Sequence, residues 1–201
     1  LGRMEDVKII KKEIKNFFIL KKNINGKKIL ITAGPTIEAI DPVRYISNFS
    51  SGKQGYEIAN CAYTFGAETI LITGPTNIEP PEVSKIIKVE SAEQMFSESM
   101  NICKKNNSID IAFLTAAVSD WKTNKANKKY KKDENIFKQI KFTENKDILQ
   151  TISNLKKSRP KIVCGFAAET GSLINNARKK LINKNCDFIF ANKISNKFNP
   201  M

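Results

Sequence analysis

The residues best suited to chemistry in this sequence are two groups of small residues able to present backbone N–H groups to a phosphate. In the first, Gly34 lets the backbone approach a ligand, and Pro35 turns the chain after a short apolar run. The second group stands directly before a helical pattern and comprises Ser50, Ser51, Gly52 and Gly55. Serine caps helices, and the free N–H groups of a helix's first turn, with a partial charge of roughly +0.5, attract phosphate. The pattern predicts an anion site between Gly34 and this helix.

The same residue types are also common punctuation of loops, so the pattern alone leaves a purely structural role open. The usual nucleotide-binding motifs are absent. There is no G-x-G-x-x-G, and Ser51 to Gln54 lacks the spacing of a P-loop.

Composition restricts the chemistry further. The chain has no histidine, which excludes acid–base catalysis by imidazole, so catalysis must come from positioning, lysines, amides and backbone donors. The formal charge of +14 and the pI near 9.6 fit nucleotides and phosphorylated metabolites, and also nucleic acid. Because the lysines are spread along the whole chain, charge discriminates little between these partners.

The length of 201 residues, of which 41% are hydrophobic, suits one α/β domain with an ample core. No apolar run approaches the ~20 residues needed to cross a bilayer, and no signal peptide is visible, so we expect a soluble, cytoplasmic protein without a membrane partner. The cysteines are scattered without a C-x-x-C pair and are expected to be buried free thiols: Cys61, Cys103, Cys164 and Cys186.

Short apolar runs alternate with helical patterns along the chain. The expected strands are 28–33, 68–73, 86–89, 109–115, 161–166 and 187–191. The expected helices are 5–18, 51–65, 91–105, 147–156 and 172–184. The segment from Trp121 to Lys146 is polar, lysine-dense and poorly periodic, and the segment from Pro35 to Phe49 is expected to be a long loop.

This alternation predicts an α/β fold of Rossmann-like, doubly wound type, with a mostly parallel sheet and helices on both faces. Ligands bind outside the carboxyl ends of the strands in such sheets. Gly34, Ala116 and Phe166 are all expected at those ends.

The segment TAGPTIEAIDPVRYISNFSSGKQG (32–55) resembles the signature of the phosphopantothenate–cysteine ligase family, the synthetase half of the bacterial bifunctional coenzyme A biosynthesis protein. The likeness continues in family order through AAVSDW (116–121), KYKK (129–132), ENKDIL (144–149), GFAAET (165–170), ARKKLINKNCD (177–187) and ANKIS (191–195). It implies a ligase domain at 26–201, preceded at 1–25 by the junction to a decarboxylase domain. Members of the family continue beyond the point that corresponds to Met201.

The resemblance implies a reaction between the carboxylate of 4'-phosphopantothenate and the amine of L-cysteine. The acid first attacks the α-phosphate of CTP and releases pyrophosphate, and cysteine then displaces CMP from the acyl-cytidylate. Mg²⁺ is implied by triphosphate chemistry, although no ligand for it can be named. FMN would belong to the decarboxylase domain and is not expected here. Family members pair as dimers, so a homodimer is expected.

Site residues follow from the matching motifs. Asn48 matches the family asparagine that contacts the acyl intermediate, and Lys129 matches the first lysine of the family's flap, for which Lys128 or Lys131 could substitute. Ala117, together with Asn48, Ala116 and Asp120, is expected to contact the acyl substrate. The nucleotide is expected to contact Gly34, Ser50, Ser51, Gly52, Gly55, Leu114, Thr115, Ala116, Asp120, Lys146, Asp147, Ile148, Leu149, Phe166, Lys180 and Lys184.

Several of these residues have a second interpretation. Asn48 and Asp120 are common in turns, and Asp147 looks like a helix N-cap. Phe166 could be core, and Lys180 and Lys184 share one helical face that could simply be solvated. Lys146 replaces the proline of the family's P-D-I-V segment.

Two other functions remain to be weighed. A nicotinamide-dependent reductase would need G-x-G-x-x-G and an acidic residue ending the second strand, which ends instead in Thr73-Gly74-Pro75. A nucleic-acid-binding module would need lysines clustered with exposed aromatics, whereas the aromatics here occupy core-like positions. We therefore expect no nucleic acid partner.

Overall fold

In a computed structural model of the chain, the described residues are 8–9, 12, 24–105, 109–131 and 140–194. Residues 8–9 and 12 are helical, and the rest of the expected helix at 5–18 lies outside the described residues. None of the helices in the described ranges is long and apolar enough to cross a membrane.

The centre of the fold is a six-stranded parallel sheet, ordered β10-β9-β6-β1-β4-β5. Its strands are β1 (Lys28–Ala33), β4 (Glu68–Thr73), β5 (Lys85–Lys88), β6 (Ile111–Leu114), β9 (Ile162–Glu169) and β10 (Phe188–Lys193). Counted in chain order the strands stand as 6-5-4-1-2-3, the doubly wound order in which the direction of winding reverses between β1 and β6. The expected fold class is confirmed.

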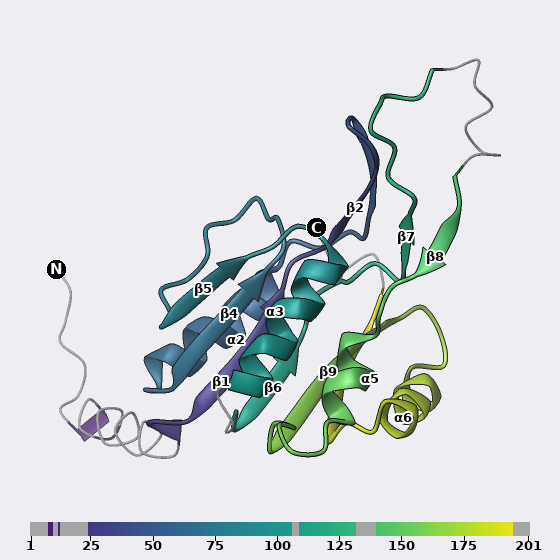
Figure 1. Cartoon of the computed structure of the whole chain (residues 1–201). Coiled ribbons are helices and arrows are strands. Elements are labelled where there is room, and N and C mark those ends of the chain that lie inside the picture. The colour runs from purple at the N-terminus through teal and green to yellow at the C-terminus, as the bar shows by residue number, and fades with distance from the viewer. Residues whose placement is uncertain (1–7, 10–11, 13–23, 106–108, 132–139, 195–201) are drawn as a thin grey trace, which may run out of the picture.

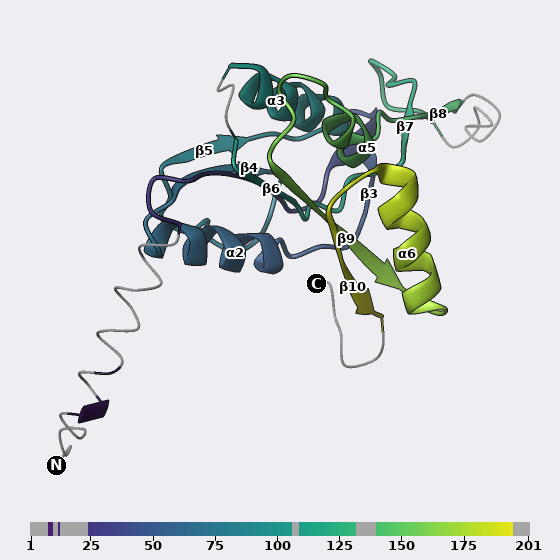
Figure 2. The ribbon, with the colours of Figure 1, turned by 90° about the horizontal axis from the view of Figure 1, so that it is seen from below.

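Helices cover both faces of the sheet, as right-handed crossovers require (Figures 1 and 2). On one face, α2 (Lys53–Thr64) packs on β1 and β4. The other face carries α3 (Ala92–Lys105), α5 (Ile148–Ser153) and α6 (Leu173–Lys184). Since α2 covers only the β1–β4 half of its face, a broad recess lies beside it over β6, β9 and β10.

Alternate side chains of β1 fill the two halves of the core. Leu30 packs with Ile70, Met95 and Ile152 toward the α3 side, while Ile31 packs with residues of α2 on the opposite side. All of these side chains are at most 3% exposed. The burial explains why this strand was predictable, because a central parallel strand reads as a continuous apolar run.

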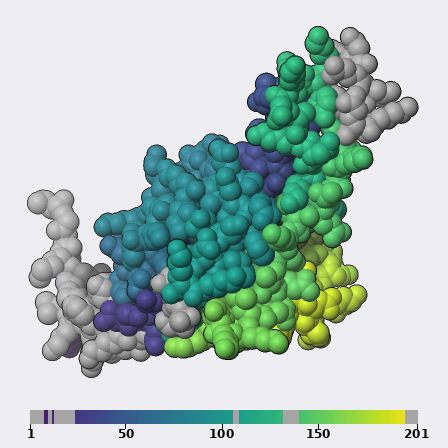
Figure 3. Space-filling view, in the orientation of Figure 1, coloured from purple at the N-terminus to yellow at the C-terminus, as the bar shows by residue number. Residues whose placement is uncertain are grey.

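Two antiparallel hairpins, which the sequence did not predict, project from the sheet as an arm (Figures 1 and 3). One pairs β2 (Ile37–Asp41) with β3 (Arg44–Ser47), and the other pairs β7 (Trp121–Thr123) with β8 (Phe142–Glu144). They are bound to each other, because the Thr123 hydroxyl donates to Ala39 O at 3.0 Å and Ala126 N donates to Ile40 O at 2.8 Å. The segment expected as a loop is thus largely strand, and the unperiodic segment contributes one short strand near each of its ends.

The cysteines are free thiols, three buried and one, Cys61, exposed, so the expected burial is wrong for Cys61. Burial raises the pKa of Cys103 and of Cys164 to about 11. No group of three or more cysteine, aspartate or glutamate residues that could hold a metal ion occurs in the described ranges.

Candidate functional site

Two recesses open beside the carboxyl edge of the sheet, and most of the expected site residues line one or the other. The α2 groove, about 950 Å³, includes Gly34, Ser50, Ser51, Gly52, Gly55, Thr115 and Phe166. The lysine pocket, about 540 Å³, includes Leu114, Ala116, Asp120, Lys146, Asp147, Ile148, Leu149, Phe166, Lys180 and Lys184. Phe166 lines both, whereas Asn48, Ala117 and Lys129 line neither.

The start of α2 packs directly on the turn that follows β1. Gly34 and Gly52 have φ of 74° and 75°, a region that favours glycine, and a Cβ on Gly52 would lie 3.3 Å from Gly34 Cα and 2.7 Å from Thr76 Cγ2. A Cβ on Gly55 would lie 2.5 Å from Ala33 Cβ. These glycines resemble those of a dinucleotide-binding turn, one for the tight turn and one for close helix–strand packing, with the β2–β3 hairpin inserted between them.

The two serines do not cap α2 as expected. The N-cap is Gly52, with no side-chain hydrogen bond to the helix. Instead the Ser50 hydroxyl accepts from Gly52 N at 3.3 Å, and the Ser51 hydroxyl accepts from Lys53 N at 3.4 Å. The hydroxyls therefore shape the loop, and a bound anion would compete with them for these two N–H groups.

The lysine pocket holds cations close to carboxylates. Lys184 Nζ lies 2.5 Å from Asp147 Oδ2, while Asp147 Oδ1 accepts from Gln150 N at 2.7 Å and so caps α5 as expected. Lys180 Nζ donates to Phe166 O at 2.8 Å. Both lysines reach from α6 into the lysine pocket, where they can exchange these partners for phosphate oxygens of a ligand.

Lys146 stands at the rim of the lysine pocket and contacts α3. Its Nζ lies 2.9 Å from Glu93 Oε1 and 4.8 Å from the centroid of the Phe96 ring. The hydrogen bond from Lys146 holds the pKa of Glu93 below its usual value, against the opposing effect of burial. More than half of the Lys146 side chain is exposed, and such a pair contributes little to stability.

Phe166 lies in the middle of β9, not at its end, because the strand continues to Glu169 in register with β10. Its ring stacks on Phe190 at 5.1 Å between centroids. The two rings form an aromatic surface in the α2 groove, and Phe190 is a lining residue that the sequence did not single out.

Asn48 reaches the chain that leaves β6. Its side-chain amide donates to Val118 O at 3.0 Å and approaches Ala117 O at 3.5 Å. Ala117 N in turn donates to Gly34 O at 2.9 Å, so the turn after β1 and the turn after β6 are joined at the point where the winding reverses. Asn48 and Ala117 therefore lie side by side.

Lys129 is exposed on the arm and lines neither recess. The neighbouring Tyr130 is held at both backbone groups: its N–H donates to Asp41, and its carbonyl accepts from Arg44 at 3.3 Å. Burial acts to raise the pKa of Asp41, but the surrounding N–H donors and the Arg44 guanidinium hold it below its usual value. The arm thus fixes the backbone next to Lys129.

Residues 24–201 match the family model described as the DNA/pantothenate metabolism flavoprotein C-terminal domain. The chain belongs to this family. The coenzyme A biosynthesis bifunctional protein CoaBC of Borreliella burgdorferi is 43% identical over 196 residues, which are 96% of this chain and 49% of that protein. CoaBC of Haemophilus influenzae is 43% identical over 195 residues, 96% of this chain and 48% of that protein.

The fold agrees with the family. The crystal structure of the C-terminal domain of CoaBC superimposes with a TM-score of 0.70 at 40% identity, covering 83% of this chain and 76% of that one. The chain spans about half the length of the curated relatives it matches.

Proposed function

We propose that this chain is a phosphopantothenate–cysteine ligase of coenzyme A biosynthesis, which joins 4'-phosphopantothenate to L-cysteine through an acyl-cytidylate. The observation that carries the proposal is the lysine pocket. Residues from β6, the β8–α5 turn, β9 and α6, far apart in sequence, bring cations and carboxylates together there, as binding of a nucleotide requires. Relatives that match 96% of the chain are named as coenzyme A biosynthesis proteins.

In this proposal the lysine pocket holds CTP. Lys180 and Lys184 neutralise phosphate charge, Asp120 accepts hydrogen bonds from hydroxyl or amino groups, and Phe166 packs against the base. Leu114, Ala116 and the segment Lys146–Leu149 form the walls. The α2 groove offers Gly34, Thr115 and the residues that open α2 to a further anionic group, since helix N-termini favour negative charge.

Charge neutralisation then makes the carboxylate attack possible. Bound Mg²⁺ would neutralise oxygens of the triphosphate. With no acidic cluster in the described ranges, the ion would be held mainly by the nucleotide and by one or two carboxylates, of which Asp120 and Glu144 line the pocket. Lys129, or its neighbours Lys128 and Lys131, would supply a cation from the arm as the site closes.

Asn48 would act on the acyl group. Its amide lies beside Ala117 and Val118, and an amide donor there can bind the acyl oxygen on which charge develops when cysteine attacks. Ala116 and Ala117 leave room for the substrate against the backbone. Since the chain has no histidine, the mechanism depends on alignment and not on imidazole proton transfer.

The proposal includes partners. We expect a homodimer, in which the arm is the obvious surface because it exposes Tyr45 and Trp121. We also expect a flavin-dependent decarboxylase domain to act with this one, and any FMN to belong to that domain. The unpaired cysteines fit the reducing cytoplasm.

The test is an assay of pyrophosphate release and product formation with 4'-phosphopantothenate, L-cysteine and either CTP or ATP. We expect pyrophosphate to require the acid, product to require cysteine, and CTP to give the faster turnover. Absence of pyrophosphate under every combination would contradict a ligase, and faster turnover with ATP would contradict the choice of nucleotide alone.

A further inference from the structure

Four residues at the base of the arm form a connected set of hydrogen bonds, which we call the bridge: Ser47, Thr36, Ser119 and Asn145. The Ser47 hydroxyl donates to Thr36 O at 2.8 Å. Ser119 N donates to the Thr36 hydroxyl at 2.9 Å, and the Asn145 amide donates to Ser119 O at 3.0 Å. The bridge therefore joins the four chain segments that enter and leave the two hairpins.

The position of the bridge follows from the topology. Thr36 precedes β2 and Ser47 ends β3, while Ser119 stands just before β7 and Asn145 follows β8 (Figure 1). Both hairpins thus leave the body of the protein through the bridge. Thr36 is fully buried and Ser119 is 2% exposed. Water therefore cannot replace the hydrogen bond between Ser119 N and the Thr36 hydroxyl without a cost in free energy.

Three bridge residues are chain neighbours of expected site residues. Ser47 precedes Asn48, Ser119 precedes Asp120, and Asn145 precedes Lys146. Asn145 also holds Asp120 through its backbone, since its N–H donates to Asp120 O at 2.8 Å. Moving one bridge residue would therefore move the acyl side of the site, at Asn48, relative to the nucleotide side, at Asp120.

We propose that the Thr36 hydroxyl is a positioning group that sets the distance between Asn48 and the lysine pocket, and that Asn145 extends its effect to Asp120. The inference rests on the proposed function. Thr36 touches no ligand in this account, so its loss leaves each substrate bound nearly as before but misaligns the groups that must react. A misplacement of about 1 Å costs roughly a hundredfold in rate.

The experiment compares Thr36→Val, which keeps the shape and removes the hydroxyl, with Thr36→Ser, which keeps the hydroxyl. Thr36→Val should lower kcat for ligation by roughly 30-fold or more while KM for CTP and for the acid changes less than about threefold. Thr36→Ser should stay within about twofold of the unaltered chain on the same scale. Thr69→Val is the matched control, because Thr69 in β4 is also fully buried, donates its hydroxyl to Ala67 O and lines neither recess.

Three outcomes would overturn the inference. These are a Thr36→Val enzyme with unchanged kcat, a Thr36→Ser enzyme as impaired as Thr36→Val, and a Thr69→Val enzyme that loses as much turnover at equal stability. The last two would show that packing and not the hydroxyl is responsible.

If the unaltered chain makes no product, the proposed function is contradicted, but the bridge can still be tested by NMR. In Thr36→Val, the side-chain amide of Asn48 and the backbone amide of Asp120 should both shift, and neither should shift in Thr36→Ser. A change confined to the Ser119 amide would contradict the bridge.

Discussion

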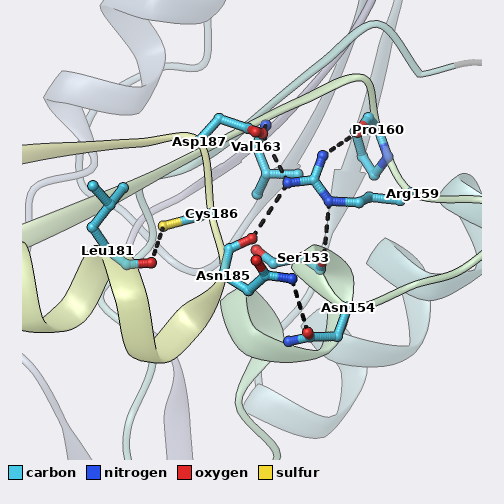
Figure 4. Close-up of polar contacts among 9 residues, drawn as sticks. All are labelled: Ser153, Asn154, Arg159, Pro160, Val163, Leu181, Asn185, Cys186 and Asp187. Carbon is cyan, nitrogen blue, oxygen red and sulfur yellow. Dashed lines mark hydrogen bonds and ion pairs between the residues drawn. The ribbon is translucent and has the colours of Figure 1, made fainter.

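The amino and carboxyl ends of the parallel strands, which form the amino edge and the carboxyl edge of the sheet, are built differently. At the amino edge, Arg159 donates through every guanidinium nitrogen: to Ser153 O, Pro160 O, Asn185 O and Asp187 Oδ2, at 2.8 to 3.3 Å (Figure 4). Asp187 also accepts from Val163 N at 2.7 Å. At the carboxyl edge, by contrast, Lys180 and Lys184 contact a carbonyl and a carboxylate that a ligand can replace. The positive-φ residues Gly34 and Gly52 allow the turn after β1 and the turn before α2 to approach each other.

The comparison indicates that the amino edge contributes mainly to the stability of the fold and that the carboxyl edge is available for binding a ligand. A partly buried guanidinium with four hydrogen bonds joins the end of α5, the end of α6 and the starts of β9 and β10. At the carboxyl edge, polar groups line the α2 groove and the lysine pocket. Substitutions should therefore separate: those at the carboxyl edge should change activity, and those at the amino edge should change stability.

The largest effect is expected for Asn48→Ala at the carboxyl edge. Pyrophosphate should still form, but product formation should fall by about 100-fold or more, because the amide that we propose as the donor to the acyl oxygen is lost. The thermal midpoint should hardly change, since Asn48 is exposed. Quantifying pyrophosphate and product in one reaction checks this, with the exposed Asn60→Ala as control. Full turnover by Asn48→Ala would remove Asn48 from the mechanism.

Arg159→Ala should show the reverse behaviour. Removing the guanidinium leaves the buried Ser153 and Pro160 carbonyls without this donor and takes one of two donors from Asp187, which should cost about 2 kcal/mol of unfolding free energy and lower Tm by roughly 4–8 °C. Turnover at 15 °C or below should match the unaltered chain. Urea unfolding and calorimetry measure the loss, against the exposed Lys157→Ala. A drop in kcat at unchanged Tm would contradict the separation of the two edges.

A smaller effect is expected for Lys184→Gln in the lysine pocket. Loss of one cation should raise KM for CTP about tenfold, equivalent to about 1.4 kcal/mol, with kcat little changed. Lys179→Gln, an exposed lysine on the same helix, is the control. If both variants raise KM equally, the pocket cation has no specific role and long-range charge explains the effect.

The smallest effect is a pH dependence at the amino edge. The Lys161 ammonium, 2.7 Å from Asp110, and the N–H of Lys28 hold the pKa of Asp110 below its usual value. A depressed pKa stabilises the fold above about pH 4, and this contribution disappears as pH falls through the folded-state pKa. The stability difference between the unaltered chain and Asp110→Asn, from urea unfolding, should therefore shrink between pH 6 and pH 3. A constant difference would show that Asp110 acts by packing alone.

The local sequence pattern was sufficient to predict the strands of the central sheet, but it did not predict the strands of the arm. β1 and β4 are buried apolar runs, and α3 begins where Ser91 and Gln94 exchange hydrogen bonds, so both signals are local. β7 and β8 have three residues each, mostly exposed, and form because the other hairpin holds them. No periodicity encodes that kind of support.

The candidate site shows the same division. Motifs singled out residues that are scattered along the chain, and the structure brings ten of them to one recess. Thr36, Ser119 and Asn145 were not predictable, because the role that we propose for them depends on contacts between segments that are not neighbours in sequence. Thr36 and Ser119, for example, are more than 80 residues apart. Phe166 was misplaced at a strand end because the pairing with β10 that extends β9 is a tertiary contact.

The most direct test of the difference between the two edges is a crystal structure of the chain with CTP and Mg²⁺. The account predicts the nucleotide in the lysine pocket, with Lys184 moved from Asp147 to a phosphate oxygen and the Arg159 contacts unchanged. A nucleotide bound at the amino edge, or none at millimolar CTP, would contradict it.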